Sequence, residues 1–192
     1  DFVAMWHGLF CVMTALRHRA TAGEGQWIDL GMYQANVSFI GEAMLDYVAN
    51  GRMGERIGNR DHFGSVQGCY QTLGDDCWMV VSARSDAEWQ SLTMVLGPAP
   101  WGEMKAPATL IDAYGRHDQV DDVLGAWAIR RTREEAINAM RRAGVPAGPV
   151  NDARDLLLDP HLRERAFYEM VDHAEGTGVG RRPLIGRGYR LS

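Results

Sequence analysis

A helix pattern that stops at a pair of glycines and soon resumes as a second helix is the feature that most constrains the fold of this chain. Apolar residues recur at three- and four-residue spacing over residues 3–19, which predicts an amphipathic helix with one buried stripe. Gly23 and Gly25 follow, and glycine readily adopts the left-handed backbone at which many helices end. Residues 27–30 are then a candidate for a short strand, and 32–49 for a second long helix. This succession of helix, strand and helix indicates an α/β fold.

A long loop separates this part from a predicted β-hairpin. Residues 51–68 contain five glycines and several charges, without the period of a helix or a strand. Loops of this length inside compact proteins are commonly functional. Two apolar or β-branched runs, 69–73 and 77–83, flank a turn-forming triplet and predict two antiparallel strands.

Three helices are predicted after the hairpin. Residues 86–96 follow Ser85, and 133–143 follow Thr132, with a glutamate three positions after each of these caps. This spacing predicts a capping box at both helix starts. Residues 118–131 form a further amphipathic helix pattern between them.

The last part of the chain alternates short helices with extended segments. Two prolines within 143–150 predict extended backbone there. We expect Asn151 to cap a short helix and Asp159 to cap another, with a proline in the first helical position of the second. Strands are predicted at 168–172 and 189–192, around a glycine-rich connection. The chain ends directly after the last of these strands, so we expect a truncated terminus.

Composition excludes several classes of protein. At 192 residues and 46% hydrophobic content, the chain is long enough for one sizeable core. A net charge of −5 predicts no nucleic-acid partner. The longest apolar stretches, 3–16 and 37–48, fall short of the roughly 20 residues that span a membrane, so no membrane partner is expected. The histidines and three cysteines form no metal-type motif, which predicts no metal site and, together with the odd cysteine count, a cytoplasmic location.

Carboxylates are the remaining candidates for catalysis, and most of them have a structural interpretation. Several belong to predicted helix starts or turns. Asp29 is interpreted as a solvated residue of the short strand. On composition alone, Asp1 would be taken as part of a frayed terminus.

Short motifs along nearly the whole chain come in the order and at the spacing of one enzyme family. They are Asp1-Phe2, 15–19 (ALRHR), 23–29 (GEGQWID), 56–59 (RIGN), 67–70 (QGCY), 74–78 (GDDCW), 85–89 (SDAEW), 143–150 (AGVPAGPV) and 159–162 (DPHL). On these motifs the chain resembles the family III CoA-transferases of the CaiB/BaiF type.

This resemblance implies an α/β fold that is the later part of the family's subunit, in which two ring-like subunits interlock as a homodimer. Residues 1–50 would be a helix-strand-helix part of a Rossmann-like large domain, and 51–68 a connecting linker. Residues 69–150 would form the smaller α/β domain, and 151–192 a truncated return segment.

The resemblance also implies a chemistry and its residues. Asp1 would be the nucleophile that attacks an acyl-CoA thioester, forming first a mixed anhydride and then an aspartyl-CoA thioester. The substrates would be an acyl-CoA, which brings the coenzyme A, and a carboxylic acid. Met32 would line the coenzyme A pocket. A substrate loop would include Gly64, Ser65, Val66 and Gln67.

Two other functions remain open at this point. An α-methylacyl-CoA racemase of the same fold also carries an Asp-Phe motif, and a non-catalytic dimerisation or scaffold module would leave Asp1 inert. The hairpin and the 85–89 motif resemble the transferases more closely. In the family, coenzyme A is held largely by residues before the Asp1 position, so we expect the isolated 192-residue polypeptide to be inactive.

Overall fold

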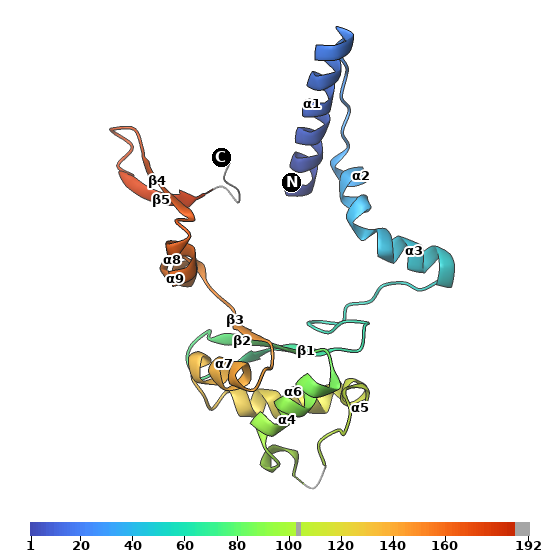
Figure 1. The fold of residues 1–192 in the computed structure, drawn as a ribbon, viewed down its shortest axis with the longest axis vertical. Helices are drawn as coiled ribbons and strands as arrows, with labels where there is room; N and C mark the ends of the chain where they lie inside the picture. The colour runs from blue at the N-terminus through green and yellow to red at the C-terminus, as the bar shows by residue number, and fades with distance from the viewer. Residues whose placement is uncertain (103–104, 187–192) are drawn as a thin grey trace. The chain divides into compact units, whose positions relative to one another are not determined.

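The computed structural model describes residues 1–102 and 105–186, and it divides into two compact units, Asp1–Arg56 and Ile57–Ser192 (Figure 1). The division falls inside the predicted connecting loop 51–68. The helices of the first unit are α1 (Phe2–Ala22), α2 (Met32–Val37), the 3-10 turn η1 (Ser38–Ile40) and α3 (Gly41–Asn50). Among the described residues, no helix has both the length and the apolar character needed to cross a membrane.

Helix α1 confirms the first predicted helix and its glycine stop. The backbone of Gly23 is left-handed, with φ 77°, and its N–H donates to the carbonyl of Arg19. The prediction that the apolar stripe is buried is wrong, because Ala4 is the one buried residue of this helix and Met5 and Leu9 are about half exposed. Within its unit, α1 packs against α2, and this contact covers only part of one side.

The predicted strand at 27–30 is also wrong. Residues 24–31 run without regular secondary structure, and the side chain of Trp27 is 91% exposed. A strand needs a neighbour to complete its ladder of hydrogen bonds. The described residues of the first unit provide no second extended segment, so the sequence pattern remains unpaired here.

The second predicted helix, 32–49, is interrupted by η1. The hydroxyl of Ser38 donates to the carbonyl of Ala35, and Ile40 leaves the helical region with φ −108° and ψ 25°. Side chains such as serine compete for backbone hydrogen bonds in this way. The helix resumes as α3 and ends at Gly51, which is left-handed with φ 68°.

The second unit contains two antiparallel sheets and several helices. The strands are β1 (Val66–Gln71), β2 (Trp78–Ala83), β3 (Ala147–Pro149), β4 (Tyr168–Asp172) and β5 (Arg181–Ile185). The helices are α4 (Asp86–Leu96), η2 (Ala99–Trp101), α5 (Leu110–Gly115), α6 (His117–Ala128), α7 (Arg133–Arg142), α8 (Ala153–Leu158) and α9 (Pro160–Glu164).

Strands β1 and β2 confirm the predicted hairpin, and β3 adds to β2 to give the order β1-β2-β3. The register places Tyr70 opposite Met79. Strand β1 begins at Val66, so the prediction of a loop through residue 68 is wrong at its end. Val66 is 1% exposed, and its burial in the core favours strand pairing over the loop that the nearby glycines suggest.

The core of the second unit lies between this sheet and helices α4, α6 and α7 (Figure 1). Alternate strand residues face the helices, because side chains alternate between the two faces of a strand. Residues buried in this core include Tyr70, Met79, Val81, Trp89, Leu92, Leu124, Ile137 and Met140. The side chains on the opposite face of the hairpin are more exposed, among them Gln67, Cys69 and Val80.

The helix caps are confirmed in part. Thr132 and Glu135 form the complete predicted capping box at α7. At α4, Ser85 accepts from the N–H of Glu88, but the carboxylate of Glu88 accepts from the N–H of Arg84 in place of Ser85. The second capping box is therefore incomplete, because the glutamate side chain reaches one residue further back.

The cap of α8 is Asp152, and the prediction of Asn151 is wrong by one residue. The carboxylate of Asp152 accepts from the N–H of Asp155, and the side chain of Asp155 accepts in return from the N–H of Asp152. With Asp152 as the cap, these two reciprocal hydrogen bonds form a capping box. A helix that started at Asn151 would not make this pair of bonds. Asp159 caps α9 as predicted, with Pro160 in the first helical position.

The sheet of β4 and β5 ends the described chain. Strand β4 confirms the prediction at 168–172, whereas the predicted strand 189–192 lies outside the described residues. Strand β4 pairs with β5, residues 181–185. The sequence pattern predicts a glycine-rich connection in this region instead. The backbone after β5 passes so close to Phe167 that a Cβ on Gly186 would collide with its carbonyl oxygen.

Candidate functional site

Asp1 stands at the N-terminal end of α1, in the N-cap position. Its carbonyl oxygen accepts from the N–H of Met5 at 2.9 Å, but its exposed side chain makes no capping hydrogen bond. The first N–H groups of a helix have no partner within the helix, and its dipole favours negative charge there. The carboxylate of Asp1 is therefore accessible and lies at the positive end of a long helix.

An apolar pocket of 550 Å³ lies on α1 directly after Asp1. It is lined by Phe2, Val3, Trp6, His7, Phe10 and Phe39. The imidazole of His7 packs edge-on against Phe39, and its Nδ1 is 2.9 Å from the carbonyl oxygen of Val3. With the carbonyl as acceptor, the proton of this bond is on Nδ1. The pocket is of the kind that accommodates an apolar group beside a carboxylate.

Met32 is the first residue of α2 in the same unit, and its side chain is 51% exposed. The structure therefore places Asp1 and Met32 at the N-terminal ends of two helices that pack against each other.

The four residues of the predicted substrate loop belong to the second unit and have different environments. Gly64 is left-handed, with φ 85°. Ser65 is 5% exposed, and Val66 is 1% exposed with its side chain in the core. Gln67 lies one position into β1 on the face that α4, α6 and α7 leave uncovered.

Asp61 organises the turn that leads into these residues. Its carboxylate accepts hydrogen bonds from the N–H of Phe63 at 2.9 Å, from the N–H of Ser65 at 3.3 Å and from the Ser65 hydroxyl. Partial burial acts to raise the pKa of Asp61, but these hydrogen bonds to the charged form outweigh it and hold the pKa below its ordinary value. The Tyr114 hydroxyl donates to the carbonyl of Asp61 and ties the turn to α5.

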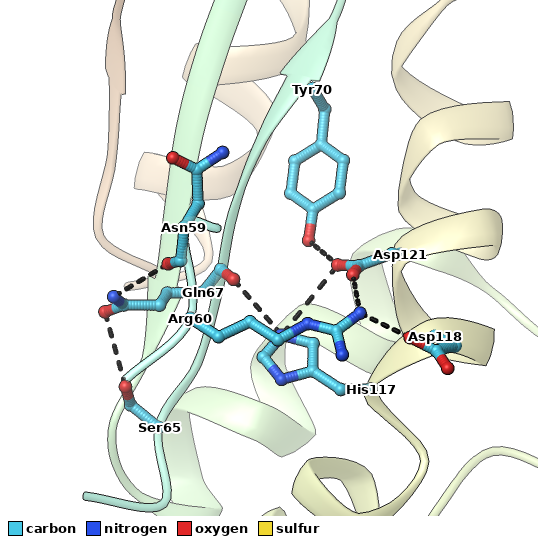
Figure 2. A network of polar contacts seen from close by, with 8 residues as sticks. All are labelled: Asn59, Arg60, Ser65, Gln67, Tyr70, His117, Asp118 and Asp121. Carbon is cyan, nitrogen blue, oxygen red and sulfur yellow. Dashed lines mark hydrogen bonds and ion pairs between the residues drawn. The ribbon is translucent and has the colours of Figure 1, made fainter. Parts of the chain in front are cut away.

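Gln67 links the turn to the start of α6 (Figure 2). The side-chain amide of Gln67 accepts from the Ser65 hydroxyl at 3.3 Å and donates to the backbone carbonyl of Asn59 at 2.9 Å. The backbone carbonyl of Gln67 accepts from Nε2 of the buried His117 at 3.1 Å. Nδ1 of His117 has no hydrogen-bond partner among the described residues.

Arg60 joins the same loop to α6 through two carboxylates (Figure 2). Its guanidinium is 2.5 Å from Asp118 and 2.6 Å from Asp121, and these two hydrogen bonds raise its pKa. The hydroxyl of Tyr70, in β1, donates to Oδ1 of Asp121 at 2.7 Å. Burial of the phenol, reinforced by this bond to a carboxylate, raises the pKa of Tyr70 well above its ordinary value.

Sequence reasoning missed this network. Asp118 and Asp121 are three residues apart and share a helix face, which is a visible signal of paired carboxylates. Their cation, Arg60, is 61 residues before Asp121 in the chain, and no local pattern connects the two. Within the part of the chain that the structure describes, no group of three or more His, Cys, Asp or Glu is arranged to hold a metal ion.

The chain matches the family model described as CoA-transferase family III over residues 1–187, and it therefore belongs to that family. It is 29% identical over 166 residues to the succinyl-CoA–D-citramalate CoA-transferase of Chloroflexus aurantiacus, a match that covers 86% of this chain and 41% of that enzyme. A probable CoA-transferase of Mycobacterium tuberculosis is 32% identical over 190 residues, which cover 97% of this chain and 22% of that protein.

Among solved structures, a CaiB/BaiF family protein from Brucella suis has a TM-score of 0.77 with this chain at 23% identity. The match covers 98% of this chain and 47% of that one. The expected α/β fold of the family is thereby confirmed. The chain spans less than half the length of each of these relatives.

Proposed function

We propose that this chain is the part of a family III CoA-transferase that carries its nucleophile, Asp1. The enzyme transfers coenzyme A from an acyl-CoA thioester to a carboxylic acid. The observation that carries this proposal is the family match over residues 1–187. Within it, Asp1 is the exposed N-cap residue of α1, and its side chain makes no capping hydrogen bond. The relative from Chloroflexus aurantiacus is named for a succinyl-CoA donor, so succinyl-CoA is the donor to test first.

The first half of the reaction makes Asp1 the carrier of coenzyme A. An oxygen of its carboxylate attacks the carbonyl carbon of the donor thioester, the C–S bond breaks, and coenzyme A leaves as a thiolate. The product is a mixed anhydride between the acyl group and Asp1. The thiolate then attacks the carbonyl carbon of Asp1 itself, which releases the donor acid and leaves an aspartyl-CoA thioester. Covalent catalysis of this kind divides one difficult exchange into easier steps.

The second half repeats the chemistry with the acceptor. The acceptor carboxylate attacks the aspartyl thioester, coenzyme A again leaves as a thiolate, and a second mixed anhydride forms. The thiolate attacks the acceptor's acyl carbon, so the new acyl-CoA departs and the Asp1 carboxylate is restored.

The environment of Asp1 supports this role. The N–H groups of Val3 and Ala4 are in the first turn of α1, where they lack helical acceptors and stabilise negative charge that develops at the carbonyl of Asp1. An acyl group packed against the apolar pocket beside Asp1 would itself cover that side from water, which matters because an acyl anhydride hydrolyses readily.

Other residues have supporting roles in the same proposal. Met32 contacts coenzyme A through its exposed side chain. Gly64, Ser65 and Gln67 form a substrate loop, to which Val66 contributes its backbone because its side chain is in the core. The active enzyme is an interlocked homodimer in the cytoplasm. The 192-residue chain alone binds coenzyme A poorly and is inactive, because its relatives are more than twice the matched length.

The test is an assay of the complete gene product with succinyl-CoA and a panel of carboxylic acids, with Asp1→Asn and Asp29→Asn side by side. Loss of a carboxylate nucleophile predicts a fall in kcat of about a thousandfold or more for Asp1→Asn. Asp29→Asn, which changes an exposed carboxylate elsewhere in the same unit, retains activity. Exchange of the α-proton of a 2-methylacyl-CoA without transfer would indicate a racemase. Absence of both reactions would indicate a scaffold. Either result contradicts the proposal.

A further inference from the structure

Asp121 is the point at which the loop before β1, the strand β1 itself and helix α6 meet. Oδ2 of its carboxylate is 2.6 Å from Arg60 in the loop, and Oδ1 accepts from the hydroxyl of Tyr70 in β1 at 2.7 Å. A carboxylate that accepts one hydrogen bond on each oxygen is fixed in orientation. Figure 2 shows both partners converging on Asp121.

The strand side of this junction is rigid. The ring of Tyr70 is 6% exposed and packs in the core. It passes over Gly68, where a Cβ would lie 2.3 Å from the phenolic oxygen, so the glycine is what gives the ring its path to Asp121. Tyr70 therefore orients the Asp121 carboxylate, and Asp121 in turn orients Arg60.

Asp118 is the weaker of the two anchors for Arg60. Its side chain is 88% exposed, whereas that of Asp121 is 32% exposed. Ion pairs between exposed groups contribute little, because solvent screens them and both side chains lose freedom. Asp121 is thus the stronger of the two anchors for Arg60, although both contacts are short.

Arg60 is next to the residue that shapes the rest of the loop. Asp61 follows it directly and accepts from the N–H groups of Phe63 and Ser65. Gln67 also bonds back to the carbonyl of Asn59, on the other side of Arg60. The position of Arg60 therefore sets the position of the turn that presents Gly64 and Ser65.

We propose that Asp121 is a positioning residue for CoA transfer, which fixes the turn of residues 61–65, and with it Gly64 and Ser65 of the substrate loop, through Arg60 and is itself held by Tyr70. This inference rests on the proposed function. In this proposal Asp121 acts through Arg60, and it keeps the loop in one arrangement before substrate binds. Preorganisation of this kind affects kcat more than KM, because a loosened loop is reordered on the way to the transition state.

The test compares Asp121→Asn with Asp118→Asn and Asp122→Asn in the complete protein. Asparagine keeps the size of the side chain and removes its charge, and Asp122 is an exposed carboxylate of the same helix. The readouts are hydrogen exchange of the Phe63 and Ser65 amides, and kcat and KM with succinyl-CoA as donor. Loss of one charge-assisted hydrogen bond predicts exchange about tenfold faster in Asp121→Asn, with kcat lowered by a similar factor and KM little changed. Asp118→Asn changes both readouts less than Asp121→Asn does, and Asp122→Asn changes them less than about twofold.

A second variant keeps the test decisive if Asp121→Asn folds poorly. Tyr70→Phe leaves the charge of Asp121 in place and removes one of its two hydrogen bonds, so it loosens the same amides by a smaller factor. Exchange that is unchanged in both variants overturns the proposal. Faster exchange with an unchanged kcat also overturns it, because the loop then moves without consequence for the reaction. A wild-type protein without transferase activity overturns the proposed function instead, and the exchange measurement still reports whether Asp121 holds the loop.

Discussion

The hydroxyl of Tyr70 donates a hydrogen bond of 2.7 Å to Oδ1 of Asp121, which is 51 residues further along the chain. The bond joins the second-to-last residue of β1 to α6. It also places a buried phenol against a carboxylate that already pairs with Arg60. The ionisation of Tyr70 therefore reports directly on the integrity of this junction.

We expect Tyr70 to keep its proton at pH values where an ordinary tyrosine, with a pKa of about 10, ionises. Burial disfavours the phenolate, and the adjacent Asp121 charge disfavours it further, so the pKa of Tyr70 is raised. The measurement is an absorbance titration of phenolate in the wild type and in Tyr70→Phe. Below about pH 12 the two proteins should titrate identically while they remain folded. A smaller phenolate signal in Tyr70→Phe would contradict the account.

The same raised pKa gives a stability prediction at alkaline pH. The unfolded chain loses the Tyr70 proton above about pH 10, whereas the folded chain keeps it, so the folded state binds more protons there. The free energy of unfolding therefore falls as pH rises above the ordinary pKa. Tyr70→Phe removes this contribution and should show a shallower decline in chemical denaturation at pH 9 to 11 (about one unit on either side of that pKa). An equal slope in the two proteins is the contrary result.

The Ser65 hydroxyl should set the acidity of Asp61. Ser65→Ala removes a hydrogen bond to the charged carboxylate, so the pKa of Asp61 rises toward its ordinary value. A carbon-detected NMR titration measures this directly. Ser82→Ala, on the open face of β2, is the control and leaves the pKa of Asp61 unchanged.

The sign of this shift also fixes its effect on stability. A folded pKa below the unfolded value stabilises the protein above about pH 4, and that contribution is lost as pH falls through the folded pKa. Ser65→Ala should therefore destabilise the protein near neutral pH and differ little from the wild type at the lowest pH. A destabilisation that persists undiminished in acid would contradict the assignment.

Two tryptophans offer a matched test of the core. Nε1 of Trp89 donates to the carbonyl of Pro107 in a fully buried site, whereas Nε1 of Trp78 donates to the exposed carboxylate of Asp76. Trp89→Phe leaves a buried carbonyl without its partner and opens a cavity, so it should lower the free energy of unfolding by about 2 kcal/mol or more. Trp78→Phe should lower it by less than about 1 kcal/mol. Equal effects in chemical denaturation would show that the Trp89 bond is not a determinant of stability.

Local features of the structure follow from the sequence where a few neighbouring residues decide them. The Thr132 capping box, the Gly23 helix end and the hairpin around residues 74–76 all depend on contacts within four or five positions. The incomplete box at Ser85 and the cap at Asp152 differ from expectation by one residue, because several polar groups there compete for the same N–H donors.

Features that need a distant partner could not be predicted. Residues 27–30 have the composition of a strand, but a strand forms only where another extended segment pairs with it. The apolar stripe of α1 has the right period, and its burial depends on what packs against it. The pairing of Arg60 with Asp121 depends on the fold of the whole second unit, so only the paired carboxylates of α6 were visible in advance.

The central claim is that Asp1 becomes covalently linked during turnover, and chemical trapping tests it most directly. The complete gene product is incubated with succinyl-CoA and quenched with hydroxylamine, which converts an aspartyl anhydride or thioester into a hydroxamate on the side chain. Peptide mass spectrometry then locates the modification, with borohydride reduction as a second trap and Asp1→Asn as the control.

We expect a hydroxamate at the side chain of Asp1 that requires both the acyl-CoA and the intact carboxylate, with Asp29 unmodified. Transfer of coenzyme A to an acceptor acid with no modification at Asp1 under either trap would contradict it.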